Sequence, residues 1–198
     1  GVPSFKMFMT YNGRVTDEFM ARAMDIIAAN GGLAQVHCEN GGAPEFLEEK
    51  AIAEGRVSPK DYPATRPAWI EDEAISRAIH LANMTNCPLH IVHLASKGAL
   101  ELIVPAQARG QWISVETCPQ YMLLNEDDMA RLGPFIKVAP PTRPNDMVHQ
   151  NAMWHGLKHG YISALASDHA PKHKEDQEPG WENIFIGPDG KAIPRGSP

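Results

Sequence analysis

Four short apolar runs in this chain each carry one residue of a kind that binds metals or protons. They are Lys6 in residues 4–9, His37 in 36–40, His93 in 90–93 and Asp168 in 166–171. Parallel α/β barrels keep their catalytic side chains at the carboxyl ends of their strands. One lysine, two histidines and one aspartate presented in this way indicate most of a two-metal hydrolytic site.

Strand and helix patterns alternate from one end of the sequence to the other. Strands are expected at 4–9, 33–37, 89–94, 112–116 and 161–167, with a further strand-like stretch at 136–139, and helices at 17–30, 44–54, 71–86, 97–109, 125–131 and 145–159. This alternation predicts an α/β fold with a parallel sheet. A closed TIM (β/α)₈ barrel has eight strands and about 250 residues. We therefore expect residues 1–198 to be a fragment of one catalytic barrel domain, roughly strands 4 to 8, without its first strands and C-terminal part.

Charge and cysteine content exclude several classes of protein. The formal net charge is -6, which gives no basic surface for nucleic acid. No apolar run approaches the roughly 20 residues that cross a bilayer. The three cysteines, Cys38, Cys87 and Cys118, form no CxxC pair, which favours a reducing cytoplasm over a disulfide framework. We expect a cytoplasmic protein with neither nucleic acid nor membrane as a partner.

The case for a metal site depends on the four residues occurring together. A single histidine at a strand end is more often a satisfied core residue, but His37 and His93 end two strands of the same expected sheet. Asp168 ends a third, where an unpaired carboxylate would be costly to bury. Cys38 is expected in the core instead, because neighbouring strand residues point to opposite faces.

Lys6 is the most distinctive of the four residues. It lies between Phe5 and Met7, so we expect apolar surroundings, although lysines at strand ends usually reach solvent. Burial lowers the pKa of a lysine and yields a neutral, nucleophilic amine. Such an amine can capture carbon dioxide as a carbamate, whose two oxygens are able to bridge two cations.

Six segments, in their order and spacing, resemble the cyclic amidohydrolases, specifically the dihydropyrimidinase/D-hydantoinase group. They are SFKMFMTY at 4–11, VHCEN at 36–40, HIVH at 90–93, ETCPQY at 116–121, APPTR at 139–143 and SDHAP at 167–171. The resemblance covers nearly the whole chain. It implies a TIM-barrel metallohydrolase that opens a cyclic amide or imide ring, such as a dihydropyrimidine or a 5-substituted hydantoin.

The resemblance also implies a set of metal ligands. Lys6 would be carboxylated and bridge two divalent metal ions, with zinc the expected metal. His37 and His93 would bind one ion, and Asp168 the other. The family takes further ligands from a His-x-His pair, which occurs nowhere in these 198 residues. Relatives are commonly tetramers, so a homotetramer is expected.

The same resemblance assigns roles in catalysis and substrate binding. The two cations would make hydroxide from a bridging water, and Asp168 would shuttle the proton to the departing ring nitrogen. Tyr11 would donate a hydrogen bond to the developing oxyanion. Tyr11, Ala139 and Arg195 would contact the substrate. Ala139 and Arg195 depart from the usual serine and asparagine, which leaves the accepted ring open.

Two alternatives remain beside a hydantoinase or dihydropyrimidinase. Tyr11 favours that group, whereas the segments at 116–119 and 139–141 are closer to allantoinase-like relatives, so allantoinase or dihydroorotase is the second enzyme hypothesis. The third is a non-catalytic relative that keeps the barrel without its metals. It is disfavoured because every ligand expected within this span is present.

Overall fold

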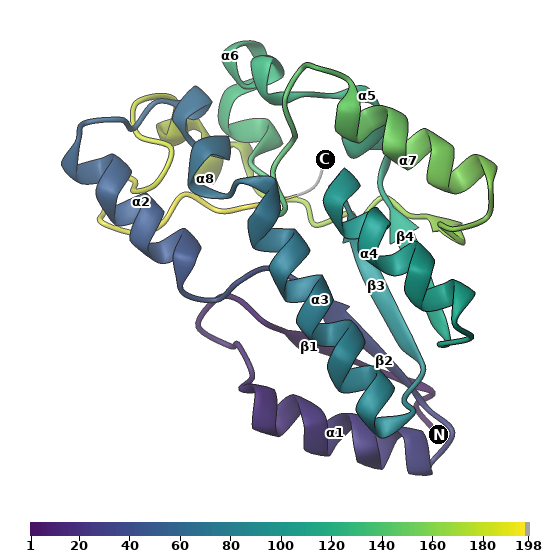
Figure 1. Cartoon of the computed structure of the whole chain (residues 1–198). Coiled ribbons are helices and arrows are strands. Elements are labelled where there is room, and N and C mark those ends of the chain that lie inside the picture. The colour runs from purple at the N-terminus through teal and green to yellow at the C-terminus, as the bar shows by residue number, and fades with distance from the viewer. Residues whose placement is uncertain (197–198) are drawn as a thin grey trace.

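The computed structural model describes residues 1–196 as one parallel sheet covered by helices (Figure 1). Its five strands lie in the order β1-β2-β3-β4-β5 and all pairs are parallel. The strands are β1 Ser4–Phe8, β2 Leu33–His37, β3 Leu89–Leu94, β4 Ile113–Thr117 and β5 Ala164–Leu165. The α/β class and the number of strands agree with the sequence prediction.

The order of the strands determines where the helices lie. Right-handed crossovers between successive parallel strands put every connecting helix on the same face when the sheet grows in one direction. Figure 1 shows α1, α3 and α4 side by side over one face, and α7 follows next to α4. These helices are α1 Asp17–Ala29, α3 Ala68–Thr85, α4 Lys97–Ala108 and α7 Val148–Lys158. Such winding is typical of a barrel wall rather than a doubly wound sheet.

The two faces of the sheet differ in chemistry because strand residues alternate between them. Met7, Val36, Ile91 and Val115 are buried in the main apolar core that includes residues of the covering helices. Their neighbours in sequence form a polar row on the other face. In the strand register Lys6 pairs with Gln35, Gln35 with His90, and His90 with Ser114. Polar and ionisable side chains therefore face away from the helices.

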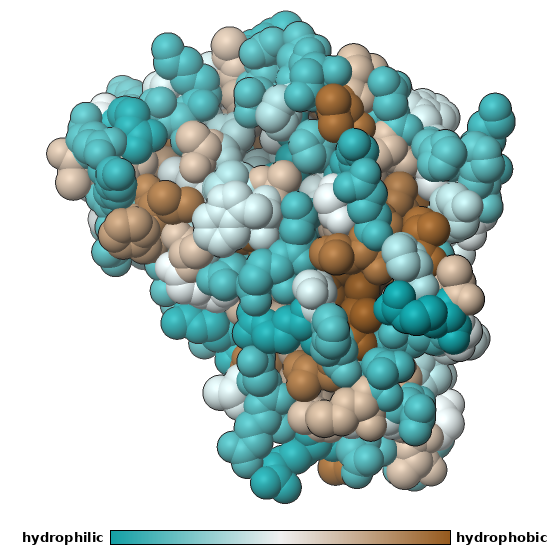
Figure 2. Space-filling view, in the orientation of Figure 1, coloured by the Kyte–Doolittle hydropathy of each residue, from teal (hydrophilic) through white to brown (hydrophobic). Residues whose placement is uncertain are grey.

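The outer surface of the helical layer is mostly hydrophilic, with an apolar strip near α4 (Figure 2). Thr16 Oγ1 accepts a hydrogen bond from the Phe19 amide and caps α1, and Ser96 Oγ caps α4 through the Ala99 amide. None of the helices in residues 1–196 combines the length and apolar character that a membrane span requires.

A smaller apolar cluster lies beyond the carboxyl ends of the strands. It brings together helix α2 (Ala43–Ala53), helix α6 (Met129–Leu132) and residues of the C-terminal segment. Its buried members are Ala51, Tyr62, Met129, Ile136, Ile184 and Phe185. Tyr62 of this cluster contacts Arg195, which lines the cavity that holds the candidate site.

The structure corrects several sequence expectations. Residues 136–139 form no strand: Ile136 ends the 3₁₀ turn Gly133–Ile136 and the next three residues are irregular, leading to Pro140, which cannot donate the hydrogen bond a ladder needs. Helix α5 (Pro119–Leu123) was not predicted. Of the residues expected as a strand at 161–167, only Ala164–Leu165 form one. A short helix α8 (Lys174–Gln177) lies in the C-terminal region, where no periodicity is visible in the sequence.

The three cysteines are buried and unpaired. This agrees with the prediction that no disulfide framework is present, and Cys38 lies in the core as expected.

Candidate active site

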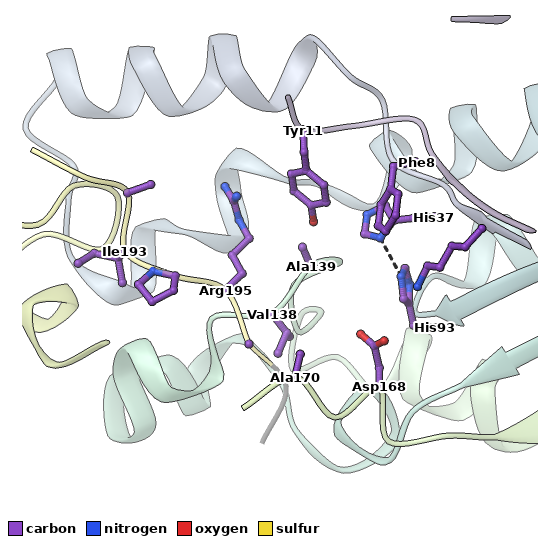
Figure 3. Close-up of a pocket in the computed structure, with 14 residues that line it drawn as sticks. Phe8, Tyr11, His37, His93, Val138, Ala139, Asp168, Ala170, Ile193 and Arg195 are labelled. Atoms are coloured by element: carbon purple, nitrogen blue, oxygen red, sulfur yellow. Dashed lines mark hydrogen bonds between the residues drawn. The ribbon is translucent and has the colours of Figure 1, made fainter. Parts of the chain in front are cut away.

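A cavity of about 400 Å³ opens at the carboxyl ends of the strands (Figure 3). All seven residues selected from the sequence line it, namely Lys6, Tyr11, His37, His93, Ala139, Asp168 and Arg195. They come from β1, β2, β3 and four loops, and most are far apart in sequence. The parallel sheet brings them together because its strands end at one edge.

Three of these residues adopt a backbone conformation that L-amino acids avoid. The φ angles of Tyr11, His93 and Asp168 are 69°, 43° and 51°. Only two other non-glycine residues in the described chain, Asn86 and Met147, have positive φ. Strain of this kind persists where the surrounding structure holds a residue in place, and it gathers at functional sites. His93 also lies at a register shift between β3 and β4.

Two buried histidines and a glutamate form a directed chain of hydrogen bonds. Glu39 Oε2 lies 2.8 Å from His37 Nε2, and His37 Nδ1 lies 2.8 Å from His93 Nε2. An ionised carboxylate can only accept, so His37 donates through Nε2 and its Nδ1 accepts from His93. In this arrangement His93 Nε2 carries the proton and points at the lone pair of His37 Nδ1.

Glu39 is held ionised by its neighbours. Its Oε2 atom lies 3.0 Å from Nη1 of Arg66, and both side chains are almost fully buried. Burial alone would raise the pKa of Glu39, but the charge of Arg66 and the hydrogen bond from His37 lower it well below its usual range. A carboxylate that fixes the orientation of a histidine is a common partner of metal-binding imidazoles.

His93 is kept neutral. Burial, together with the nearby His37 and Lys6, lowers its pKa well below the usual value. Its Nδ1 atom is buried and has no hydrogen-bond partner within residues 1–196. A neutral imidazole is the form that binds a metal ion, so these two histidines suit a cation chemically.

Besides the two histidines, the described residues bring only part of a metal-ligand set to the cavity. Asp168 lies below the histidines in Figure 3 with its carboxylate turned into the cavity. Burial raises the pKa of Asp168, although Lys6 and His37 oppose the shift. Over the described residues, no three His, Cys, Asp or Glu side chains are close enough together to hold a metal ion. The donor chemistry fits a cation, and these residues would supply part of its coordination.

The burial expected for Lys6 is not observed. Lys6, Phe5 and Phe8 are all exposed, and Phe5 retains 49% of its surface. The physical reason is that β1 pairs only with β2 in the described chain, so its other edge is open. The amine of Lys6 lies 5.3 Å from the centre of the Phe8 ring.

Tyr11 and Arg195 lie on the other side of the cavity from Asp168. Burial, and then the charge of Glu39, raise the pKa of Tyr11 far above its usual value, so it stays a neutral hydrogen-bond donor. The guanidinium of Arg195 lies 5.4 Å from the centre of the Tyr11 ring. Ala139 lines the cavity just before Pro140, whose carbonyl accepts a hydrogen bond from Tyr121.

Several residues of this site were missed by sequence reasoning. Glu39 lies inside the VHCEN segment, but its ion pair with Arg66 could not be anticipated. No strand or helix was expected at residues 56–69, yet Tyr62 and Arg66 from this stretch are buried. Glu48 of α2 was also missed; it forms an ion pair with Arg195. The only available signal was the position of Glu39, two residues after the candidate ligand His37.

No family model matches this chain. It is 35% identical to a D-hydantoinase from Rhizobium radiobacter over 204 residues, which cover 100% of this chain and 43% of the relative. It is 37% identical to an allantoinase from Escherichia coli O9:H4 (strain HS), covering 86% of this chain and 39% of the relative.

A solved structure of a D-hydantoinase (dihydropyrimidinase) from Thermus sp. superposes with a TM-score of 0.91 at 29% identity. The superposition covers 100% of this chain and 43% of that one. The chain thus spans less than half the length of the relatives and structures that it matches here.

Proposed function

Since this chain is a homologue of the hydantoinase and dihydropyrimidinase group of cyclic amidohydrolases, we propose that it forms the catalytic face of a metal-dependent hydrolase. The substrate is a cyclic amide, either a dihydropyrimidine or a 5-substituted hydantoin. One observation carries the proposal: the facing nitrogens of His37 and His93, 2.8 Å apart, share a cavity with Lys6 and Asp168.

The residues that would hold the metal ions are Lys6, after carboxylation, with His37, His93 and Asp168. When bound, divalent cations such as zinc supply a Lewis acid for the ring carbonyl and lower the pKa of a water. Glu39 keeps the accepting nitrogen of His37 turned toward His93. Because Glu39 is buried against Arg66, it stays ionised and continues to accept the hydrogen bond from His37 Nε2.

Two residues act on the substrate in this proposal. Tyr11, a neutral donor, hydrogen-bonds the oxygen on which negative charge develops as the carbonyl carbon is attacked. Asp168 accepts the proton from the attacking water and transfers it to the ring nitrogen as the C–N bond breaks. Its raised pKa suits a carboxyl group that must hold a proton for part of the cycle.

We also propose that these residues are roughly strands 4 to 8 of a barrel. The one-directional strand order and the open edges of β1 and β5 support this, as does the 43% coverage of the relatives. Assembly as a homotetramer in the cytoplasm is proposed from the resemblance and from the unpaired cysteines.

Metal analysis of the full-length protein tests the proposal directly. We expect about two metal ions per chain in the parent and a clear loss in Lys6→Ala, because the bridging group is removed. Lys97→Ala is the matched control, since Lys97 is an exposed lysine on α4. Unchanged metal content in Lys6→Ala would reject the bridging role.

Allantoinase is the second candidate, supported by the relative from Escherichia coli at 37% identity. Assays of dihydrouracil, hydantoin, allantoin and dihydroorotate with the metal-loaded protein separate the two. Opening of allantoin alone would favour the second candidate and reject the first.

A further inference from the structure

Arg195 brings a positive charge to the wall of the cavity. Within residues 1–196, it is the only charged side chain that lines the cavity apart from the proposed metal ligands. It is therefore the group best suited to distinguish one substrate from another by charge.

The guanidinium of Arg195 is held in place on two of its three nitrogens. Nη2 lies 2.7 Å from Glu48 Oε1, and Nε donates to the hydroxyl of Tyr62 at 3.1 Å. Tyr62 is itself fully buried and donates to the carbonyl of Val138 at 2.8 Å. The third nitrogen, Nη1, has no partner among the described residues. A fixed guanidinium with one free donor is prepared to bind an acceptor.

In the wall behind Arg195, each acidic side chain is paired with an arginine. Arg66 and Arg195 are matched by Glu39 and Glu48, and Lys137 lies beside them, 5.4 Å from the centre of the Tyr62 ring. Lys137 is 1% exposed. Its Nζ atom donates to the carbonyls of Ile184 and Ile193, so this wall presents no unpaired carboxylate that would repel an anion.

The position of Arg195 relative to the reacting centre indicates which part of a substrate it meets. Figure 3 shows Arg195 across the cavity from His37, His93 and Asp168, with the hydroxyl of Tyr11 between them. A ring whose carbonyl lies between Tyr11 and the histidines would direct its exocyclic substituent toward Arg195. The guanidinium therefore meets the substituent rather than the scissile amide.

We propose that Arg195 binds a carboxylate at the end of the substrate's exocyclic side chain, so that this protein prefers acidic cyclic amides over neutral ones. The inference rests on the proposed function and narrows its substrate class. Charge-assisted hydrogen bonds from a guanidinium to a carboxylate are short and directional, and an uncharged amide in the same place gains less.

The test compares two substrates of the same shape with the metal-loaded, full-length protein. Hydantoin-5-acetate carries the carboxylate, and hydantoin-5-acetamide replaces it by a neutral amide. We expect kcat/KM for the acid to exceed that for the amide by about tenfold or more. In Arg195→Gln this preference should fall by a similar factor, mainly through a higher KM for the acid.

Two further variants separate substrate binding from a merely structural role. Glu48→Gln breaks the same ion pair but leaves the guanidinium in the cavity, so the preference for the acid should persist or increase. Arg22→Gln removes an arginine from the exposed surface of α1 and should leave the ratio unchanged. An equal loss of preference in Glu48→Gln and Arg195→Gln would overturn the binding role.

The outcomes also separate this inference from the proposed function. If both rings are opened at equal kcat/KM, the inference is overturned while the hydrolase proposal stands. If the metal-loaded protein opens neither ring, and hydantoin itself is not opened, both are overturned.

Discussion

Glu39 connects the two chemical halves of the cavity through a single carboxylate. Its Oε2 atom accepts from His37 at 2.8 Å and lies 3.0 Å from Arg66, whose guanidinium is in turn 5.6 Å from the centre of the Tyr11 ring. The orientation of the histidines and the position of the tyrosine are thus coupled. A substitution of Glu39 should therefore lower both the stability of the fold and the affinity for metal.

Glu39→Gln tests this coupling. The amide keeps the size of the side chain but leaves the buried Arg66 without a full counter-charge, so we expect the free energy of unfolding to fall by about 3 kcal/mol. Metal affinity should drop by about 10- to 100-fold because His37 loses its charged partner. Urea unfolding and metal titration of the full-length protein measure the two effects.

Glu45→Gln is the matched control for this substitution. Glu45 pairs with Arg14 on the surface, with about half of its side chain exposed. Surface pairs contribute up to about 1 kcal/mol, so the control should change little. Equal effects of the two substitutions would show that Glu39 has no special role.

The residue scale also shows where sequence reasoning reaches its limit. Lys6, His37, His93 and Asp168 were selected because strand ends in a parallel sheet converge, and the structure places all four around one cavity. Arg66 gave no such signal. It lies in a proline-rich stretch without periodicity, and its burial depends on Glu39, which is 27 positions earlier in the sequence.

At the scale of elements, Lys137, which directly follows the 3₁₀ turn Gly133–Ile136, joins that turn to the C-terminal segment. Its Nζ atom donates to the carbonyls of Ile184 and Ile193 at 2.6 and 2.8 Å. Ile193 precedes Arg195 by two positions, so this contact helps to place the wall of the cavity. Burial, and then the charge of Arg195, lower the pKa of Lys137 to about 7.

The lowered pKa of Lys137 predicts a pH dependence of stability. Between pH 7 and about 10.4, the usual lysine pKa, the unfolded chain binds a proton that the folded chain does not. The contribution of Lys137 to the free energy of unfolding therefore rises with pH across this window, by at most about 1.4 kcal/mol per pH unit. Below pH 7 the folded protein bears the cost of a buried charge.

Urea unfolding of the full-length protein at pH 7 and pH 9.5 checks this expectation. Lys137→Met should remove part of the rise seen in the parent between the two values. Lys97→Met, at an exposed position, should keep the parental rise. Parallel pH profiles for the parent and Lys137→Met would contradict the prediction.

Element boundaries could be predicted where one face of a strand is apolar. Residues 33–37 and 89–94 coincide with β2 and β3, because buried parallel strands are short apolar runs bounded by turns. The same rule failed at 136–139. Ile136 packs in the small cluster with Tyr62, and Val138 packs in another small cluster with Tyr121. Neither belongs to the sheet, and periodicity alone does not separate these cases from a strand.

For the molecule as a whole, the sheet has two open edges within the described residues, at β1 and β5. Beside β1, Phe19 and Ile26 of α1 are 56% and 64% exposed and line a hollow with Phe5. Large apolar groups gathered at an unpaired strand are typical of a surface that other chain covers. In the barrel proposed here, a preceding strand and helix would lie against this edge.

Hydrogen exchange of the β1 amides in the full-length protein tests whether another strand pairs there. Met9 donates to the carbonyl of His37 and Pro3 accepts from Leu33, so alternate residues of β1, including Met7, face β2. Lys6 and Phe8 must then direct their amides to the open edge. If a further strand pairs with β1, these two amides will exchange as slowly as the amide of Met7, which serves as the internal control. Fast exchange at Lys6 and Phe8 beside slow exchange at Met7 would mean that β1 is a true edge strand and that the sheet does not close into a barrel.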